Sequence, residues 1–382
     1  MTRLPIRWLL LLITCVVALP AAGIILYSGI QYRNAVLEDA NKETVKLADR
    51  IGTEHQDLVA GAVQLMTAQN QLPDVKRGDA ARVVPVLREL RKLNPMYSNI
   101  FIADTAGKVW ATAVPVKPPF FVGDRRYFRN ALADNRLSSG EFIISRATAK
   151  PSFNFACPLK DDQGGIIGVI SVGFVIDRYR NLLEQMQFPK GTDIVLLDHR
   201  GVILSRSVNP EAVIGKPYPA AGFRDIGEGP EAGTAVRIGM TGDEQIVSYR
   251  KLRFAGEKTP YMYVLAGIPV AEAVRKANAA LVKNVAIFTS FLMLSCLCAA
   301  VIGKRSVMDR VKLLEDASQR LAAGDLQVRV SELVVGGELG SLGKTFDAMA
   351  AELARREAER SKAEAEKDLL TGQLMQAHKM ES

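Results

Sequence analysis

Two uncharged apolar runs constrain this chain more than any other feature. The first extends from Trp8 to Ile30 and the second from Val285 to Ile302. Each is long enough to cross the hydrocarbon core of a bilayer, which takes roughly 17 to 25 helical residues. The alternative interpretation of the first run is a cleaved signal peptide, because small residues surround Pro20. The apolar character continues past Pro20 into a helical pattern, which favours an uncleaved anchor, so we predict transmembrane helices at residues 8–30 and 284–303.

Positive charges at the far ends of both runs predict how the chain is oriented. Arg3 and Arg7 precede the first run, and Lys304 and Arg305 follow the second. Lysine and arginine mark the cytoplasmic side of a membrane helix. The N-terminal residues 1–7 and everything after residue 303 are therefore expected in the cytoplasm, with residues 31–283 on the other side.

Composition excludes several classes of function. The formal net charge is +8, but the lysines and arginines are spread along the chain without a basic run interleaved with aromatics. A nucleic-acid partner is therefore not expected. The three histidines and four cysteines form no metal-ligand or nucleophile pattern, and no nucleotide-binding glycine loop is present. We expect no catalytic residue, no metal and no cofactor in this chain.

The segment outside the membrane begins with a long helical pattern. Ile51, Leu58 and Leu65 recur every seven residues, which is the spacing of one helix face. The proline at position 73 ends the pattern. Residues 31–72 are therefore predicted to form a stalk helix that continues from the first membrane helix.

One pattern of strand, tight turn and strand then occurs twice. It covers residues 99–110 and again residues 193–204, with an aspartate and a glycine of the turn in register. Aspartate can bond to its own turn backbone and glycine accepts positive φ, so both residues suit a tight turn. Further strands are predicted after each copy, at residues 152–159 and 166–176 and at residues 245–252 and 261–268. The predicted fold class is α+β: two antiparallel-sheet modules in tandem, membrane-distal at 73–190 and membrane-proximal at 191–270.

Two motifs in this segment are similar to those of a known family. The run Gly123-Asp124-Arg125-Arg126-Tyr127-Phe128-Arg129-Asn130-Ala131-Leu132 resembles the pocket motif of double Cache (dCache) sensor domains, and residues 164–170 also match. The resemblance implies a stalk helix followed by two stacked PAS-like modules, with the ligand in the distal one.

The resemblance also implies a set of ligand-binding residues. Arg125, Tyr127 and Phe128 stand in the motif, and arginine offers a rigid fork of donors that suits a carboxylate. The alternative for each aromatic candidate is ordinary core, and for Arg146 it is a solvated surface charge. The candidates placed across from the motif are Arg146, Phe101, Trp110, Phe153 and Phe155.

The motif departs from that of the amino-acid-sensing members, which carry Arg-x-Trp-Tyr and an aspartate that holds the ligand ammonium. Here the first motif is Arg125-Arg126-Tyr127-Phe128, and the aspartate position falls at Gly173. This favours a simple carboxylate, as in the dicarboxylate-sensing members, or another small anion.

Two amphipathic stripes follow the second membrane helix. Short helices of this coiled-coil period can bury their stripes only against another copy of the chain, which predicts a homodimer. Residues 336–340 resemble the start of the second helix of a HAMP relay, which we therefore expect at residues 304–356. The predicted relay residues are Leu314, Leu321, Glu338, Leu342, Phe346 and Met349.

The remaining residues, 357–382, are predicted to form a coiled-coil signalling helix. Residues 374–382 resemble the start of the dimerisation helix of a group of sensor histidine kinases, and His378 does not fit their phosphoacceptor motif. The resemblances together imply the sensing and relay half of a two-component sensor histidine kinase in the bacterial inner membrane. Its response regulator would be reached through a kinase core that this chain does not contain. The alternative is a chemotaxis-type receptor or another Cache-HAMP protein without its output domain.

Overall fold

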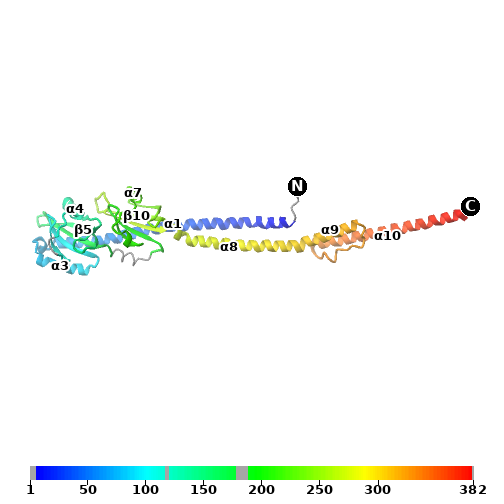
Figure 1. Ribbon diagram of the computed structural model, residues 1–382, viewed down its shortest axis with the longest axis horizontal. Helices are drawn as coiled ribbons and strands as arrows, with labels where there is room; N and C mark the ends of the chain where they lie inside the picture. Colours follow the sequence, from blue (N-terminus) through cyan, green and yellow to red (C-terminus); the bar gives the residue numbers. More distant parts are fainter. Residues whose placement is uncertain (1–5, 117–119, 178–187, 381–382) are drawn as a thin grey trace. The chain divides into compact units, whose positions relative to one another are not determined.

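The computed structural model describes residues 6–116, 120–177 and 188–380. The segment Ile30–Ala279 forms one compact unit, and the segments before and after it group into a second. The helices and strands of both units are coloured along the chain in Figure 1. Because the two units are separate bodies, each is described by itself.

The first helix, α1 (Ile6–Asn70), is continuous and contains Pro20. It therefore joins the first apolar run and the predicted stalk in one element. A second long helix, α8 (Val270–Ile302), contains the second apolar run. Both are long and apolar enough to cross a membrane, and their apolar windows are not buried in the protein. The two apolar helices thus flank the sheet-containing segment.

The distal module begins with α2 (Pro73–Lys76) and α3 (Ala80–Leu93) and continues into a six-stranded sheet. The strand order is β2-β1-β6-β5-β3, and β4 also pairs with β5. All named pairs are antiparallel. The elements are β1 (Tyr97–Asp104), β2 (Val109–Thr112), α4 (Arg126–Asp134), β3 (Ser138–Ser139), β4 (Ile143–Ile144), β5 (Pro151–Lys160) and β6 (Ile166–Val175).

The proximal module repeats this arrangement in a five-stranded sheet of order β8-β7-β11-β10-β9. The central pairing is equivalent in the two modules, because Asn99 lies opposite Gly173 and Asp193 lies opposite Gly267. The elements are β7 (Asp193–Asp198), β8 (Ile203–Arg206), α6 (Pro210–Val213), α7 (Ala220–Glu228), β9 (Ala232–Ile238), β10 (Glu244–Leu252) and β11 (Met262–Pro269). The predicted α+β class with antiparallel modules behind a long helix is confirmed.

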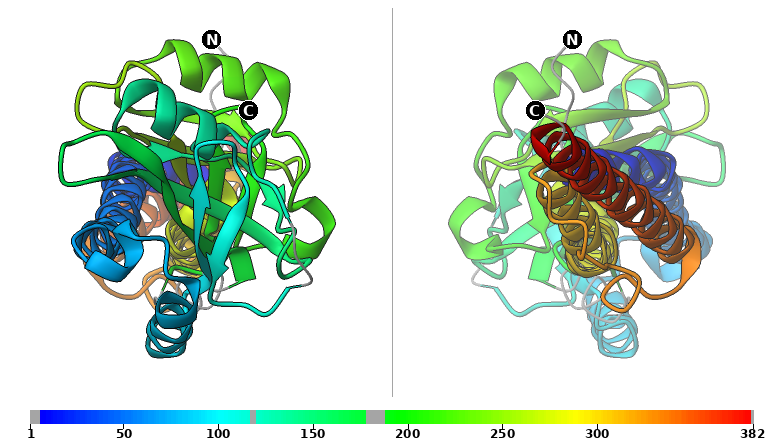
Figure 2. Two further views of the ribbon diagram at one scale, coloured as in Figure 1. Left: turned by 90° about the vertical axis from the view of Figure 1, so that its left-hand side faces the viewer. Right: turned by 90° about the vertical axis from the view of Figure 1, so that its right-hand side faces the viewer.

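The two faces of the sheets have different covers. One face of both sheets shares a single core with α1 and α3, including Ile51, Leu87 and Phe155. The other faces form two smaller cores, one in each module. Figures 1 and 2 show α4 and α7 on the side of the sheets away from α3. The space beneath α4 is therefore separate from the core on the stalk side.

The second unit continues α8 through a π-helical turn (Gly303–Met308) into α9 (Asp309–Ala322) and, after a connector, α10 (Gly337–Met380). The Asp347 carboxylate accepts bonds from the backbone N–H of Val330 (2.7 Å) and Ser331 (2.9 Å), which pins the connector to α10. Of the predicted relay residues, Phe346 is buried, while Leu314 and Leu321 pack against its cluster. The remaining three, Glu338, Leu342 and Met349, are exposed.

Candidate ligand pocket in the distal module

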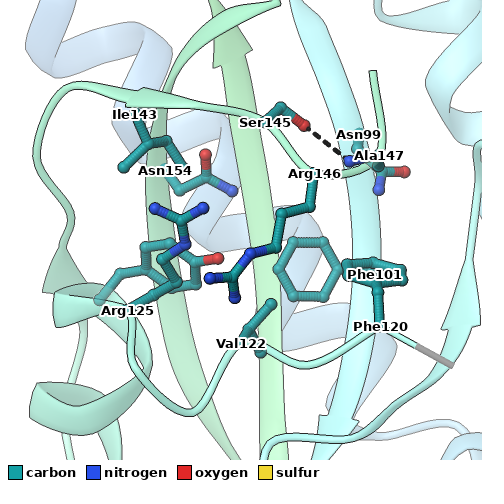
Figure 3. A pocket seen from close by; sticks show the side chains of 11 residues that line it. Asn99, Phe101, Phe120, Val122, Arg125, Ile143, Ser145, Arg146, Ala147 and Asn154 are labelled. Carbon is teal, nitrogen blue, oxygen red and sulfur yellow. Dashed lines mark hydrogen bonds between the residues drawn. The ribbon is translucent and has the colours of Figure 1, made fainter. Parts of the chain in front are cut away.

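The strongest candidate site is a small cavity beneath α4, on the sheet face away from the stalk. Its volume is about 20 Å³, enough for roughly one water molecule. Figure 3 shows its side chains converging from the sheet, from the loop before α4 and from the segment after β4. The lining residues are Asn99, Phe101, Phe120, Val122, Arg125, Tyr127, Ile143, Ser145, Arg146, Ala147 and Asn154.

The turn between β1 and β2 positions the loop that leads to Arg125. Gly107 has φ +86°, and a Cβ there would lie 2.6 Å from the backbone nitrogen of Gly123. Only glycine therefore allows this close approach. The Val122 N–H donates to the Gly107 carbonyl (2.9 Å), and the Arg125 N–H donates to the Val122 carbonyl (2.9 Å). The repeated turn motif thus fixes one wall of the pocket.

Arg125 and Arg126 are consecutive but have different surroundings. Arg125 is the N-cap of α4, with extended φ and ψ, and its guanidinium lines the pocket. Arg126 is the first helical residue and donates to the Ser139 carbonyl (2.9 Å) and to Gly140 (3.2 Å). The backbone change at the helix start sends one arginine to the cavity and the other to the neighbouring strand.

Charge in the pocket is unbalanced toward positive. Arg146 makes a two-pronged ion pair with Asp124, at 2.7 Å for each contact, and this pair lowers the pKa of the Asp124 carboxyl. The Arg125 guanidinium has no hydrogen-bond or ion-pair partner among the described residues. Burial raises the pKa of Tyr127, so its hydroxyl is a neutral donor. These groups suit a ligand that carries negative charge.

Asparagine amides form the floor of the pocket. The Asn99 amide is bonded to the Thr112 hydroxyl (3.0 Å) and to the backbone N–H of Val114 (3.2 Å). The Asn154 amide donates to the Ser171 hydroxyl (3.4 Å). Both asparagines lie opposite Gly173 in the sheet. The floor is therefore polar and uncharged.

Four residues predicted from the sequence lie together in this pocket, namely Arg125, Tyr127, Arg146 and Phe101. Phe128 is buried behind them in the same cluster, on α4. Whether they contact a ligand stays a prediction.

Three predicted residues do not line this cavity and lie on the other face of the sheet. Phe153 and Phe155 are fully buried in the core on the stalk side, and Trp110 packs against that core. Side chains alternate between the two faces of a strand, so Asn154, between the two phenylalanines, is the residue of this trio that faces the cavity.

Seven lining residues were not predicted. For two of them the sequence does hold a signal: Asn99 and Asn154 are polar residues beside large apolar residues in buried strands, and a buried polar group needs a partner. The other five come from the loop before α4 and the segment after α4, where no periodicity reveals orientation: Phe120, Val122, Ile143, Ser145 and Ala147.

Comparison with known proteins identifies both units. Residues 31–277 match the family model dCache_1, described as a Cache domain, and residues 304–355 match the HAMP domain model. The resemblance to double Cache and HAMP domains inferred from the motifs is thus confirmed.

Individual relatives are distant. Sporulation kinase D of Bacillus subtilis (strain 168) is 20% identical over 127 residues. The match covers 33% of this chain and only 25% of that kinase. The ligand-binding domain of the Pseudomonas fluorescens chemoreceptor CtaA, in complex with L-isoleucine, is 17% identical with a TM-score of 0.50. The match covers 64% of this chain and 98% of that one. The corresponding domain of the Campylobacter jejuni chemoreceptor Tlp3, in complex with L-valine, is 15% identical with a TM-score of 0.47 and covers 63% and 97%.

Proposed function

This chain belongs to the Cache domain family, and from that premise we propose that it is a transmembrane signal receptor for a small anion. The ligand binds in the distal module, beneath α4, and the HAMP domain relays the signal. The sensor domain lies in the periplasm or outside the cell, with both chain ends in the cytoplasm of a bacterium. The flanking apolar helices and their terminal positive charges support this topology.

The observation that carries the proposal is that the Arg125 guanidinium lacks a counter-charge in the part of the chain that the structure describes. It lines the cavity, as Tyr127 does, and has no ion-pair partner among the described residues. A half-buried, unpaired cation is unfavourable because it loses hydration without gaining a counter-charge. An anion that accepts from the Arg125 fork would restore that balance, and a carboxylate fits the fork best.

The pocket favours an anion without an ammonium group. None of the described lining residues is acidic, and the nearby Asp124 carboxylate is already paired with Arg146. Gly173 stands where amino-acid-sensing members carry an aspartate. CtaA and Tlp3 bind amino acids, but the α-ammonium of such a ligand would find no carboxylate partner here.

For the output, we favour the sensing and relay half of a sensor histidine kinase. The match to sporulation kinase D supports this assignment. A chemotaxis-type receptor is the alternative, supported by the fold shared with the CtaA ligand-binding domain. A response regulator would be a partner only in the first case, through a kinase core. In both cases the chain works as a homodimer whose HAMP helices pair between copies.

Contacts within the sensor unit offer a route for the signal. The backbone N–H of Phe142, in the distal module, donates to the fully buried Asp198 carboxylate of the proximal module (3.1 Å). The Arg200 guanidinium lies 3.6 Å from the Glu141 carboxylate. The cavity has room for only about one water molecule, so a ligand must displace the cavity walls. That displacement would pull on the proximal module through residues 140–142.

The first test is ligand binding to the full chain in lipid nanodiscs, measured by calorimetry against small carboxylates and amino acids. Arg125→Ala is expected to weaken carboxylate binding about tenfold to hundredfold, since a hydrogen-bonded charge contributes about 1.5–3 kcal/mol. Arg129→Ala is the matched control: it removes the same charge from an exposed position on the same helix. Equal affinity in both variants would count against the proposed pocket, and no binding of any anion would count against the proposed function.

The second test concerns the dimer. Leu342 and Met349 are each about half exposed, at 53% and 51%, one heptad apart on α10. Exposed leucine and methionine in such a stripe are expected to lie against the same residues of a second copy. Leu342→Cys, in a background without the four native cysteines, should therefore crosslink rapidly in membranes under mild oxidation. Lys344→Cys, which is also exposed, is the control; similar rates at both positions would contradict the parallel bundle.

A further inference from the structure

A second polar group in the pocket has chemistry that the proposed anion does not satisfy. Asn154, on β5, is only 5% exposed and lines the cavity. Its side-chain oxygen Oδ1 is buried and has no hydrogen-bond partner among residues 6–116, 120–177 and 188–380. A buried acceptor without a donor costs about 1–3 kcal/mol. The neighbouring Asn99 differs, because its Oδ1 accepts from Val114 and Thr112.

The orientation of the Asn154 amide follows from its neighbour. The Ser171 hydroxyl donates its one hydrogen to the Phe155 carbonyl (2.9 Å), so toward Asn154 it can only accept. The group facing Ser171 must then be the amide nitrogen Nδ2, which lies 3.4 Å away. An exchanged amide would set two acceptors against each other. Oδ1 is therefore the atom left for another partner.

The backbone beneath Asn154 leaves room for that arrangement. A Cβ at Gly173 would lie 3.0 Å from Oδ1 and 2.9 Å from Nδ2 of Asn154. Any side chain at position 173 would press on the amide. Gly173, the position where the resemblance to amino-acid-sensing members would place an aspartate, thus leaves space for a neutral acceptor.

We propose that Asn154 Oδ1 accepts a hydrogen bond from a hydroxyl group of the ligand, and that the pocket selects a hydroxycarboxylate. This rests on the proposed function, since the carboxylate is held by Arg125. In the structure neither pocket guanidinium bonds to Oδ1, so this acceptor is open to a donor on the ligand. An ammonium group could also donate, but it would lie beside two guanidinium groups with only a neutral oxygen to face it. A hydroxyl donates without that repulsion.

The test uses matched ligands that differ in one group. Malate, succinate and aspartate carry hydroxyl, hydrogen or ammonium on the same skeleton, as do lactate, propionate and alanine. Binding to the full chain in nanodiscs is measured for both sets, with Asn154→Ala and Asn154→Leu as the variants. The wild-type protein is expected to bind a hydroxy acid at least about tenfold tighter than the parent acid, and both variants should lose that preference.

Each outcome is decisive. Equal affinity for hydroxy and parent acids in the wild-type protein would overturn the assignment of Asn154 but leave a carboxylate receptor. A preference for the hydroxy acid that survives in both variants would also overturn the assignment of Asn154. Tighter binding of the amino acids would overturn the exclusion of ammonium. If no acid binds to the wild-type protein, the proposed function itself fails. The melting temperature of each ligand-free variant shows whether it is folded. Asn154→Leu keeps nearly the same side-chain volume, so it remains informative if Asn154→Ala leaves a void that the pocket residues fill.

Discussion

Arg206→Ala is expected to destabilise the sensor unit by about 3–5 kcal/mol, the range measured when one partner of a buried ion pair is removed. Arg206 and Asp193 have side chains only 4% and 6% exposed, and their closest contact is 2.6 Å. Without the guanidinium, the Asp193 carboxylate would remain buried and uncompensated. The measurement is the free energy of unfolding in urea, compared between the wild type and the variant for residues 31–277, which include the sensor unit's buried cores.

The duplication explains why the pair is there. In the distal module, Asn99 is bonded to Thr112 at the pocket floor. The equivalent positions in the proximal module, by strand pairing, are Asp193 and Arg206. The proximal module therefore fills the corresponding place with its own anion and cation. Loss of Arg206 should weaken folding rather than ligand binding.

The pH dependence of the destabilisation by Arg206→Ala distinguishes the loss of a charge partner from the loss of packing. Burial already raises the pKa of Asp193 in the wild-type protein, and removing the guanidinium raises it further. In the variant, the folded state then holds a proton on Asp193 that the unfolded state releases, so this carboxyl's own contribution to stability increases as the pH falls. The destabilisation should thus be smaller at pH 4 than at pH 7.

Arg237→Ala is the matched control. It removes an arginine of the same module whose partner, Asp225, is 62% exposed, and such pairs contribute about 1 kcal/mol or less. If Arg206→Ala and Arg237→Ala had similar effects, the buried pair would not stabilise the module as argued.

The sequence predicted the fold better than the site. Strand limits at β5, β6, β10 and β11 agree with the structure to within one residue, because turn residues interrupt apolar runs there. The tandem arrangement followed from one repeated turn, in which glycine is required by positive φ at Gly107 and Gly201.

The site was harder to predict because both faces of the distal sheet are buried. Alternation along β5 places Asn154 on one face of the sheet and Phe153 and Phe155 on the other. Because both faces are buried, the sequence lacks the polar residues that would mark a solvent-facing side, and the two faces cannot be distinguished. Aromatic residues were therefore assigned to the pocket although they belong to the core. The separate surroundings of Arg125 and Arg126 likewise depend on where α4 begins, which sequence patterns locate only to a few residues.

Acid is expected to weaken the sensor unit through His55, a residue of the stalk helix. His55 is 2% exposed, and its ring lies 6.1 Å from Phe155 of the distal module and 5.8 Å from Tyr261 of the proximal module. Burial lowers the pKa of His55 from 6.5 to about 3, because a charged imidazole would lose its hydration in these aromatic surroundings.

The sign follows from proton binding. Between pH 6.5 and pH 3 the unfolded chain protonates this histidine and the folded chain does not, so stability falls as the pH falls. From pH 7 to pH 4 the loss due to His55 amounts to about 3 kcal/mol, at about 1.4 kcal/mol per pH unit below the unfolded pKa.

His55→Leu isolates this contribution, because leucine keeps an apolar side chain at the junction but cannot take up a proton. Urea unfolding of residues 31–277 at pH 7 should give similar stabilities for the wild type and the variant, and at pH 4 the variant should be the more stable by about 3 kcal/mol. His199→Gln is the control, since His199 is only half-buried and should account for a smaller share. Equal acid sensitivity in the wild type and His55→Leu would mean that this ring is not the group that acid charges. If the prediction holds, the stalk helix meets both modules at a point that tolerates no charge, and acidification would loosen the contact between this helix and the two modules.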